Sequence, residues 1–411
     1  MQKGQLRTII SRQKLEKENL QSIPYIDRDK LTQGKRWMSS ELIKVILGPR
    51  RSGKSVFSLM LLKNYDFAYF NFDDPAIVNK DLNLYELIDE IKSIYGKTKY
   101  ILFDEIQNLP SWELFANRLH RQGYNIVLTG SNANLLSMEL ATHLTGRHLP
   151  IEILPLNFAE ILRANKNKNQ NELLEKYLIN GGFPEVVLKN QQPLGYLDIL
   201  FDSVLFKDVV KRHNVRFSEQ ASQLGSYLIN NTSSQYSSRR LTNILNFKSD
   251  VTLEKYLGYL TEAYIIFPLS RYSAKAGIRI KSPKKIYVID NGFITAKAVQ
   301  HSLDQGKLME NLVFTELMKR GFKPNHDLFY YKTRNDREVD FIIKKEHKVI
   351  ELIQVCYNIS DFDVKQREMK SLLEAKEELN VEKLTILTWD DEKTEELIHF
   401  KPLLKWLTEK L

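Results

Sequence analysis

The sequence predicts an α/β protein whose first domain is a parallel sheet that carries a phosphate-binding loop. The pattern Gly48-Pro-Arg-Arg-Ser-Gly-Lys-Ser55 lies between an apolar run at 42–47 and a helical pattern. A second apolar run ends in the acid pair Asp104-Glu105, and a third occupies 125–130. Apolar runs of this length suit strands that are buried on both faces of a parallel sheet. In such sheets, the polar residues that follow the strands gather at the carboxyl edge.

The first of these patterns is typical of a P-loop, the Walker A motif. Its glycines let the backbone curl so that successive N–H groups point at phosphate oxygens, and a helix N-terminus adds partial positive charge. Lys54 is predicted to lie between the β- and γ-phosphates of ATP, and Ser55 to bind Mg²⁺. The alternative is a glycine-rich turn without a ligand. We expect ATP to be bound by Gly48, Pro49, Arg50, Arg51, Ser52, Gly53, Lys54 and Ser55, with Arg50 and Arg51 facing solvent as the alternative for those two.

The acid pair after the second apolar run has the pattern of a Walker B motif. Asp104 is predicted to hold the water shell of Mg²⁺, and Glu105 to polarise the water that attacks the γ-phosphate. The alternative is an ordinary helix cap after a strand.

The third run is predicted to lie between the other two strands, which would bring its polar end beside the γ-phosphate. Ser131 or Asn132 would then act as a sensor that responds to hydrolysis of the γ-phosphate. The alternative is that either residue only caps the next helix. Arg147 follows a glycine just past a predicted helix. It is interpreted as an arginine finger that acts on a neighbouring subunit or on its own site, with a surface salt bridge as the alternative.

Composition limits the class of protein. The 411 residues are enough for two to three domains, and the single cysteine, Cys356, rules out internal disulfides. No uncharged apolar run reaches about 18 residues, so we expect a cytoplasmic protein with no membrane partner. The net charge of +9 is compatible with an anionic partner, but a lysine-rich solvated surface explains it equally well.

The middle of the chain has the pattern of a winged helix. Two helical segments, 238–245 and 250–262, are separated by a short break, and runs at 265–269 and 286–289 are predicted to form a two-stranded wing. The basic segment 273–285 between those runs would bind along the phosphate backbone of a nucleic acid. The alternative is a module that packs against protein and carries lysines only for solubility.

The motifs together resemble the AAA-type P-loop ATPases of bacteria and archaea that carry a C-terminal domain of unknown function. This resemblance implies ATP binding and an AAA-like domain. It covers most of the chain and rests on Gly48–Ser55, Phe103-Asp-Glu-Ile-Gln-Asn108, Leu128-Thr-Gly-Ser131, Leu144-Thr-Gly-Arg147, Pro155-Leu-Asn-Phe-Ala-Glu160 and Gly181-Gly-Phe-Pro-Glu185.

The last segment resembles the restriction-endonuclease-like nucleases. Glu310 on a helix and Asp340 on a strand match two acids of that pattern, which implies a Mg²⁺ site for phosphodiester cleavage. The strand that should supply Glu-x-Lys reads Gln354-Val-Cys356 instead. Loss of one carboxylate and of the lysine argues against cleavage, so we expect a nuclease-like fold that is used for binding.

These expectations describe an α/β protein with three domains and a polar loop at 164–171 after the first. The three domains are an AAA-like ATPase core at 1–163 with a leader helix, a helical and winged-helix region at 172–300, and a nuclease-like domain at 301–411. We expect an ATPase that acts as a molecular switch, whose ATP and Mg²⁺ bias the binding of a partner. Double-stranded DNA is the first candidate partner, a protein is the alternative, and self-association is open. An NTP-regulated protein scaffold and an ATP-dependent nuclease are the competing functions.

Overall fold

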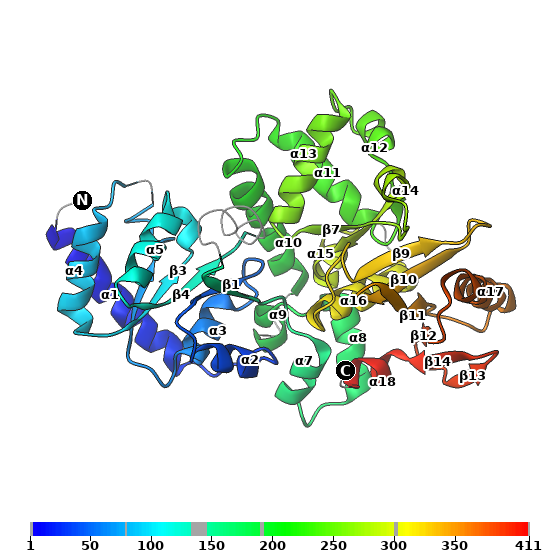
Figure 1. The fold of residues 1–411 in the computed structure, drawn as a ribbon, viewed down its shortest axis with the longest axis horizontal. Helices are drawn as coiled ribbons and strands as arrows, with labels where there is room; N and C mark the ends of the chain where they lie inside the picture. Colours follow the sequence, from blue (N-terminus) through cyan, green and yellow to red (C-terminus); the bar gives the residue numbers. More distant parts are fainter. Residues whose placement is uncertain (1–2, 79, 133–145, 190–192, 300–302, 410–411) are drawn as a thin grey trace. The chain divides into compact units, whose positions relative to one another are not determined.

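The computed structural model describes residues 3–78, 80–132, 146–189, 193–299 and 303–409 (Figure 1). The chain divides into two compact units, Met1–Leu156 and Asn157–Leu411. Among the described residues, no helix is both long enough and apolar enough to cross a membrane.

The first unit is built on a five-stranded sheet in which all strands are parallel. Its strands in spatial order are β2 (Phe67–Asn71), β3 (Tyr100–Asp104), β4 (Asn125–Gly130), β1 (Ile43–Leu47) and β5 (His148–Glu152). As predicted, the third apolar run forms a strand between the other two. The carboxyl ends of β1, β4 and β3 are therefore neighbours at one edge of the sheet.

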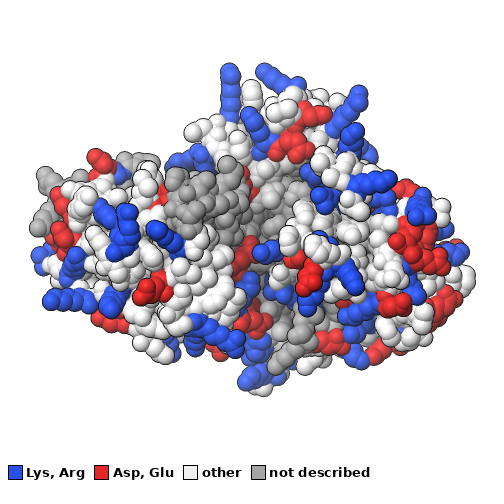
Figure 2. Space-filling view, in the orientation of Figure 1, with Lys and Arg blue, Asp and Glu red and all other residues white. Residues whose placement is uncertain are grey.

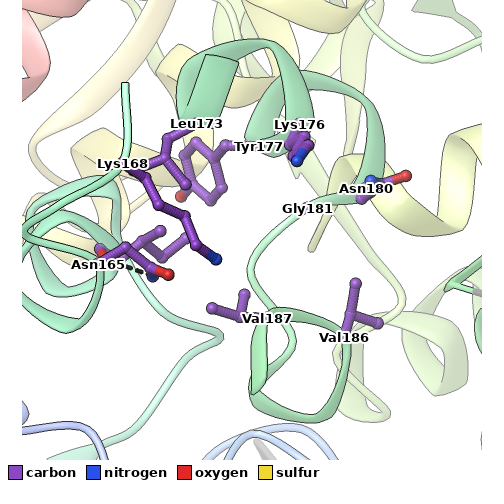
Figure 3. Close-up of a pocket in the computed structure, with 10 residues that line it drawn as sticks. Asn165, Lys168, Leu173, Lys176, Tyr177, Asn180, Gly181, Val186 and Val187 are labelled. Carbon is purple, nitrogen blue, oxygen red and sulfur yellow. Dashed lines mark hydrogen bonds between the residues drawn. The ribbon is translucent and has the colours of Figure 1, made fainter. Parts of the chain in front are cut away.

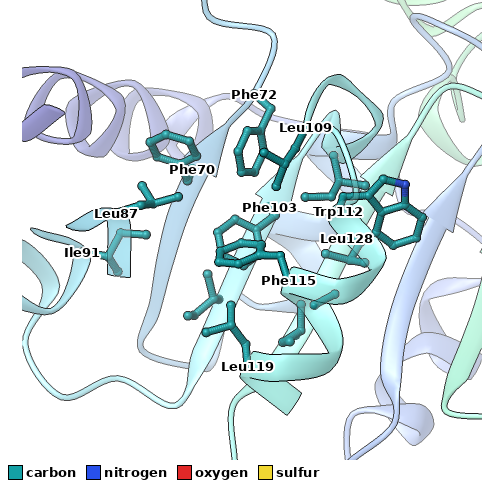
Figure 4. Packing of buried hydrophobic residues seen from close by; sticks show 14 of the residues in the cluster. Phe70, Phe72, Leu87, Ile91, Phe103, Leu109, Trp112, Phe115, Leu119 and Leu128 are labelled. Atoms are coloured by element: carbon teal, nitrogen blue, oxygen red, sulfur yellow. The ribbon is translucent and has the colours of Figure 1, made fainter. Parts of the chain in front are cut away.

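Helices cover both faces of this sheet (Figure 1). They are α1 (Lys3–Ser22), α2 (Leu31–Trp37), α3 (Lys54–Leu61), α4 (Leu84–Tyr95), the short 3₁₀ helix η1 (Ile106–Asn108) and α5 (Trp112–Arg121). Helices α1, α4 and α5 pack on one face, and α2 and α3 on the other. In Figure 4, Phe103 of β3 lies between Phe72 and Phe115, with ring centroids 5.8 and 5.3 Å away. Truncating a buried aromatic ring of this kind costs about 3–5 kcal/mol, so this core holds the strand that ends in Asp104 rigidly.

The second unit begins with a helical part and a three-stranded antiparallel sheet of order β6-β8-β7. Strands β7 and β8 pair where the two strands of the wing were predicted, and β6 adds a third strand. The helices are α7 (Phe158–Ala164), α8 (Gln170–Asn180), α9 (Pro184–Lys189), α10 (Pro193–Val204), the π-helix η3 (Leu205–Lys211), α11 (Ser218–Asn230), α12 (Ser238–Ile244), α13 (Asp250–Glu262), α14 (Ala276–Lys281) and α15 (Asn291–Ala296). The strands are β6 (Gln235–Tyr236), β7 (Ile266–Leu269) and β8 (Lys284–Val288).

A six-stranded mixed sheet of order β13-β14-β12-β11-β10-β9 completes the second unit. Its strands are β9 (Leu328–Lys332), β10 (Glu338–Lys345), β11 (Lys348–Val355), β12 (Leu384–Thr388), β13 (Lys393–Glu395) and β14 (Ile398–Pro402). The accompanying helices are α16 (Gln305–Lys319), α17 (Phe362–Leu379) and α18 (Leu403–Thr408). Helix α17 packs its buried residues Met369, Leu372 and Ala375 against β10, β11 and β12.

The Gly-Gly-Phe-Pro segment after α8 has a structural explanation. Gly181 ends the helix with φ 72°, and a Cβ there would lie 1.5 Å from Oδ1 of Asp290. The Asp290 carboxylate accepts hydrogen bonds from the N–H groups of Gly182 (2.8 Å) and Gly292 (2.9 Å), so it cannot move aside freely. Burial raises the pKa of Asp290 to about 6. Both the positive φ and the close approach require glycine.

The predicted polar loop at 164–171 is shorter than expected. Helix α7 extends through Ala164, and α8 begins at Gln170, where Asn169 accepts a hydrogen bond from the N–H of Asn171 at 2.8 Å. Asn169, one of the asparagines that were expected to prevent order, instead caps a helix, which is a favoured position for that side chain. Figure 3 shows the pocket beside this connection, where Lys168 faces Tyr177. Its volume of about 50 Å³ holds a few waters at most and is far too small for a nucleotide.

Candidate active site

The P-loop connects the end of β1 to the start of α3. Gly48 has φ 145°, and a Cβ there would lie 2.0 Å from the carbonyl oxygen of Ile153, so only glycine fits. Gly53 has φ 93° and stands directly before the first helical residue, Lys54. The two glycines of the motif therefore bend the loop over the N-terminus of α3, where backbone N–H groups favour an anion.

Lys54 lies within this loop with its side chain only 3% exposed. Its Nζ donates a hydrogen bond to the carbonyl oxygen of Pro49 at 3.0 Å, and it is 3.8 Å from Oε1 of Glu105. The ammonium group is thus placed between the loop backbone and the end of β3.

Asp104, the last residue of β3, is surrounded by hydroxyl groups. Ser55 donates to its Oδ1 at 3.0 Å, Tyr69 donates to Oδ2 at 3.1 Å, and Thr129 also donates to Oδ1. Burial, with the negative charge of Glu105, raises the pKa of Asp104. A serine hydroxyl and a carboxylate held together are oxygen ligands of the kind that Mg²⁺ prefers.

The described residues contain no group of three or more His, Cys, Asp or Glu side chains that could hold a metal ion. Mg²⁺ keeps several waters and is usually held by one or two protein oxygens together with substrate phosphates. The pair Ser55 and Asp104 fits that donor set.

Glu105 has a left-handed backbone, with φ 50°, and begins the turn η1. Its side chain accepts a hydrogen bond from the Nε2 of Gln107, which also donates to the Oγ of Ser131 at 3.2 Å. Burial acts to raise the pKa of Glu105, but the charges of Lys54 and Arg50 outweigh it, and the net pKa is lowered. The carboxylate therefore stays ionised near neutral pH and can accept a proton.

The structure brings Lys54, Ser55, Asp104, Glu105 and Ser131 together at the carboxyl edge of the sheet. Sequence reasoning did not single out Gln107, which joins two of them. Its place depends on the left-handed Glu105, and no local sequence pattern signals that conformation at this residue.

The remaining arginines differ in position. Nη1 of Arg50, on the P-loop, lies 3.6 Å from Oδ2 of Asp73. Arg51, the next residue of the loop, has a left-handed backbone with φ 63°. Arg147 is exposed and stands just before β5, where its carbonyl oxygen accepts from the N–H of Ile43. Ile43 begins β1, and the P-loop follows the other end of that strand, roughly 15 Å away at about 3.3 Å per residue. The backbone geometry thus does not support the interpretation of Arg147 as a finger on its own site; residues 144–145 of that motif lie outside the described residues.

A second group of carboxylates lies in the second unit. Nζ of Lys285 is 2.6 Å from Glu310, 2.8 Å from Glu338 and 3.0 Å from Asp340. The prediction that Lys285 belongs to an exposed basic tip is wrong, because this residue of β8 is only 1% exposed. The lysine of the Glu-x-Lys pattern is replaced by Cys356, yet β8 supplies a lysine to the same acids. Burial opposes its charge, but the surrounding carboxylates raise the pKa of Lys285 well above its usual value.

A cavity of about 630 Å³ opens beside this group, between α16, β10, β11 and α17. Gln354 lines this cavity: its Oε1 accepts from the N–H of Asp340 at 3.1 Å, and its Nε2 donates to Glu368. Burial raises the pKa of Cys356 to about 11, so its thiol stays neutral. The cavity lining has more acidic than basic side chains: Asp304, Glu310, Asp336, Glu338, Asp340 and Glu368 against Lys307, Arg337 and Arg367. An acidic lining of this kind repels a phosphodiester unless a bound cation offsets its charge.

Three parts of the chain match known domain families. Residues 40–162 match an AAA domain, residues 171–303 match a domain of unknown function (DUF8612), and residues 305–406 match another domain of unknown function (DUF4143). The AAA match covers the P-loop and the strands β1 to β5, and it supports binding or hydrolysis of a nucleotide by this domain.

Relatives match over nearly the whole chain. The uncharacterized protein MJ1544 of Methanocaldococcus jannaschii is 39% identical over 396 residues, which cover 89% of this chain and 88% of that protein. An uncharacterized protein of Haemophilus influenzae is 32% identical over 88% of this chain and 92% of that protein. Among solved structures, the Walker-type ATPase PABY2304 of Pyrococcus abyssi has a TM-score of 0.47 at 14% identity, with 66% of this chain and 96% of that chain covered. On the identity and coverage of these relatives, the chain belongs to the same protein family as MJ1544, and its residues 40–162 are an AAA domain of the P-loop class.

Proposed function

We propose that the chain binds ATP with Mg²⁺ and hydrolyses it, and that the nucleotide state biases how the second unit engages a partner. The observation that carries this proposal is the hydrogen bond of 3.0 Å between Ser55 and Asp104. It joins the helix that follows the P-loop to the end of β3, which is the pairing that a Mg²⁺-nucleotide needs.

Each residue of the centre has a role in the proposed reaction. The loop N–H groups and Lys54 hold the phosphates, while Ser55 and Asp104 would hold Mg²⁺. Bound Mg²⁺ would neutralise charge on the phosphate oxygens. Glu105, kept ionised by Lys54 and Arg50, takes a proton from the attacking water.

Arg147 is proposed to act on the site of a neighbouring copy. Its distance from its own P-loop favours this alternative over action in its own chain, and its exposure leaves it accessible to another copy. Turnover per chain should then rise with protein concentration, and Arg147→Ala should abolish that rise without changing ATP affinity.

Double-stranded DNA is the partner we propose for the second unit, which we interpret as containing a winged helix. The segment from Ala263 to Ile289 contains no acidic residue. Cations outside the buried sheet lie on and around α14, where no residue is buried. They are Lys275, Arg279 and Lys281, and the half-buried Lys284 follows at the start of β8. Figure 2 shows basic side chains projecting at the top of the view, over α12 to α14, with acidic ones among them.

A protein partner is the competing proposal. Helix α13 would be the recognition helix of a winged helix, yet it carries Asp250, Glu254 and Glu262. Those charges repel phosphate, and the neighbouring Val251 is 67% exposed. DNA contact is therefore proposed for the α14 segment and not for α13. Nuclease activity is disfavoured because Gln354 provides an amide where the nuclease pattern needs a carboxylate.

The first experiment is ATP hydrolysis by the purified chain, with and without duplex DNA, at low and moderate salt. Lys54→Ala is the control, because the phosphates lose their cation and the loop should lose nucleotide affinity. Stimulation by DNA that persists at moderate salt supports the DNA-linked switch. Hydrolysis without stimulation favours the protein partner, and absence of both binding and hydrolysis overturns the proposed function.

A further inference from the structure

We propose that Gln107 is a positioning residue. It orients the attacking water between the side-chain oxygen Oε1 of Gln107 and the carboxylate of Glu105. This inference rests on the proposed hydrolysis of ATP. No motif assigned a role to Gln107, and only its contacts single it out.

The amide nitrogen of Gln107 is fully engaged. One N–H donates to Oε2 of Glu105, and the other donates to Oγ of Ser131 at 3.2 Å. This fixes which way the amide faces, because a carboxylate only accepts hydrogen bonds. Turning the amide over would place its carbonyl oxygen against the carboxylate, and two acceptors repel each other.

The carbonyl oxygen Oε1 of Gln107 is consequently held in one place. It is buried and has no hydrogen-bond donor among the described residues. An unpaired buried acceptor costs about 1–3 kcal/mol, so the site favours a small donor such as water. A water there can give one hydrogen to Oε1 of Gln107 and the other to Glu105, which leaves a lone pair directed away from both.

The proposed step is the hydrolysis of the terminal phosphoanhydride. The lone pair of the water oxygen forms a bond to the γ-phosphorus, and the proton goes to Glu105. The bond from that phosphorus to the bridging oxygen breaks, and its electron pair leaves with ADP. Gln107 exchanges no proton. It sets the direction of the lone pair, in the way that an oriented glutamine places water in other phosphoryl-transfer sites.

Two features of the fold hold Gln107 in this position: the backbone conformation of Glu105 and the hydrogen bond to Ser131. The left-handed Glu105 starts η1 and turns the chain back, so that a side chain two residues later reaches the carboxylate. Ser131, at the end of β4, is 1% exposed and anchors the other side of the amide. The next residue, Asn108, points elsewhere: its Nδ2 donates to Oδ1 of Asp73 at 3.0 Å. Asn108 therefore provides a matched control on the same turn.

The test compares Gln107→Ala, Gln107→Glu and Asn108→Ala in the full chain. Turnover, KM, ATP affinity and the pH profile of kcat are measured for each. We expect Gln107→Ala to lower kcat by about 10- to 100-fold, because positioning is lost while Glu105 remains. ATP affinity should change by less than about twofold, since the phosphates are held by the P-loop.

The pH profile separates positioning from a general loss of structure. The hydrogen bond from Gln107 helps to lower the pKa of Glu105, so its removal should move the acid limb of kcat to higher pH. Gln107→Glu keeps the size of the side chain but adds a negative charge, and it should move that limb further. Asn108→Ala should leave kcat and the limb in place.

Three outcomes would overturn the inference. They are unchanged kcat in Gln107→Ala, a raised KM with unchanged kcat, and the same loss of kcat in Asn108→Ala as in Gln107→Ala. A wild-type chain that neither binds nor hydrolyses ATP would instead overturn the proposed function, so the two failures are distinguishable.

Discussion

The two units each place a buried lysine among carboxylates, but with different contacts. In the P-loop centre, defined as Lys54, Ser55, Asp104 and Glu105, the lysine lies 3.8 Å from the carboxylate of Glu105. In the C-terminal cluster, defined as Lys285, Glu310, Glu338 and Asp340, the lysine lies within 3.0 Å of three. The first arrangement suits a site whose side chains release their contacts when a ligand binds. The second suits a permanent joint, that is, a fixed ionic contact that ties β8 to α16 and β10.

The difference follows from what stabilises each carboxylate. Asp104 is held by the hydroxyls of Ser55, Tyr69 and Thr129, and a neutral hydrogen bond contributes only about 0.5–1.5 kcal/mol net. A metal ion can displace such donors at low cost. Removing one partner of a buried ion pair costs about 3–5 kcal/mol, because the other charge is left uncompensated. The C-terminal cluster therefore resists the exchange that the P-loop centre is proposed to perform.

The largest expected difference between the two sites is in turnover. Glu105→Gln should lower ATP turnover by about 10²- to 10⁴-fold, because the amide cannot accept the proton from water. ATP binding should be retained, as measured by titration with a fluorescent nucleotide. Asp340→Asn in the C-terminal cluster is the matched variant and should leave turnover unchanged. Retained turnover in Glu105→Gln would contradict the assignment of Glu105.

Stability should show the opposite pattern. Lys285→Met keeps most of the side-chain volume but removes the ammonium, and it should lower the free energy of unfolding by about 3–5 kcal/mol, as measured by urea denaturation. Lys284→Met is the control, because Lys284 precedes Lys285 on β8 and is only half-buried. If the two variants are equally stable, Lys285 does not act as the joint described above.

The C-terminal cluster should also make stability depend on pH. Burial and the charge of Asp340 raise the pKa of Glu310 to about 8 from its ordinary 4.5, while Lys285 and Tyr287 oppose the rise and Glu338 adds negative charge nearby. The folded state thus holds a proton that the unfolded state releases, so this contribution is complete below pH 4.5 and is lost as the pH rises to about 8. The free energy of unfolding of the wild type should fall across this range relative to that of Glu310→Gln. A difference that does not change with pH would show that Glu310 titrates normally.

The P-loop centre was predictable from sequence because its residues lie at the ends of short apolar runs. Parallel strands end at a common edge, so Lys54, Asp104 and Ser131 could be brought together without knowing any side-chain contact. The same rule explains why Arg147 lies away from its own P-loop. It precedes a strand parallel to β1, and the start of such a strand lies at the edge opposite to the P-loop.

The C-terminal cluster was only partly predictable. Glu310 and Asp340 were found from their order along the chain, whereas Lys285 comes from a strand of another sheet and has no fixed spacing to them. Six of the residues in 271–285 are basic, so nothing local distinguished the buried lysine from the others. Gln107 escaped notice for a related reason, since a positive φ at Glu105 is rare for a residue with a side chain and could not be anticipated.

The smallest expected effect tests whether the hydroxyl groups around Asp104 are exchangeable. Tyr69→Phe removes one donor to Oδ2 of Asp104 while keeping the ring in the core. Because Ser55 and Thr129 still donate to Oδ1, the free energy of unfolding should fall by only about 1 kcal/mol in thermal or urea denaturation. Added Mg²⁺-ATP should reduce this difference if Mg²⁺ replaces the hydrogen bond from Tyr69, because the variant then loses less than the wild type on binding and binds the nucleotide more tightly. A loss comparable to that of Lys285→Met would mean that Asp104 is held as rigidly as the C-terminal cluster, and the contrast between exchangeable and permanent carboxylates would fail.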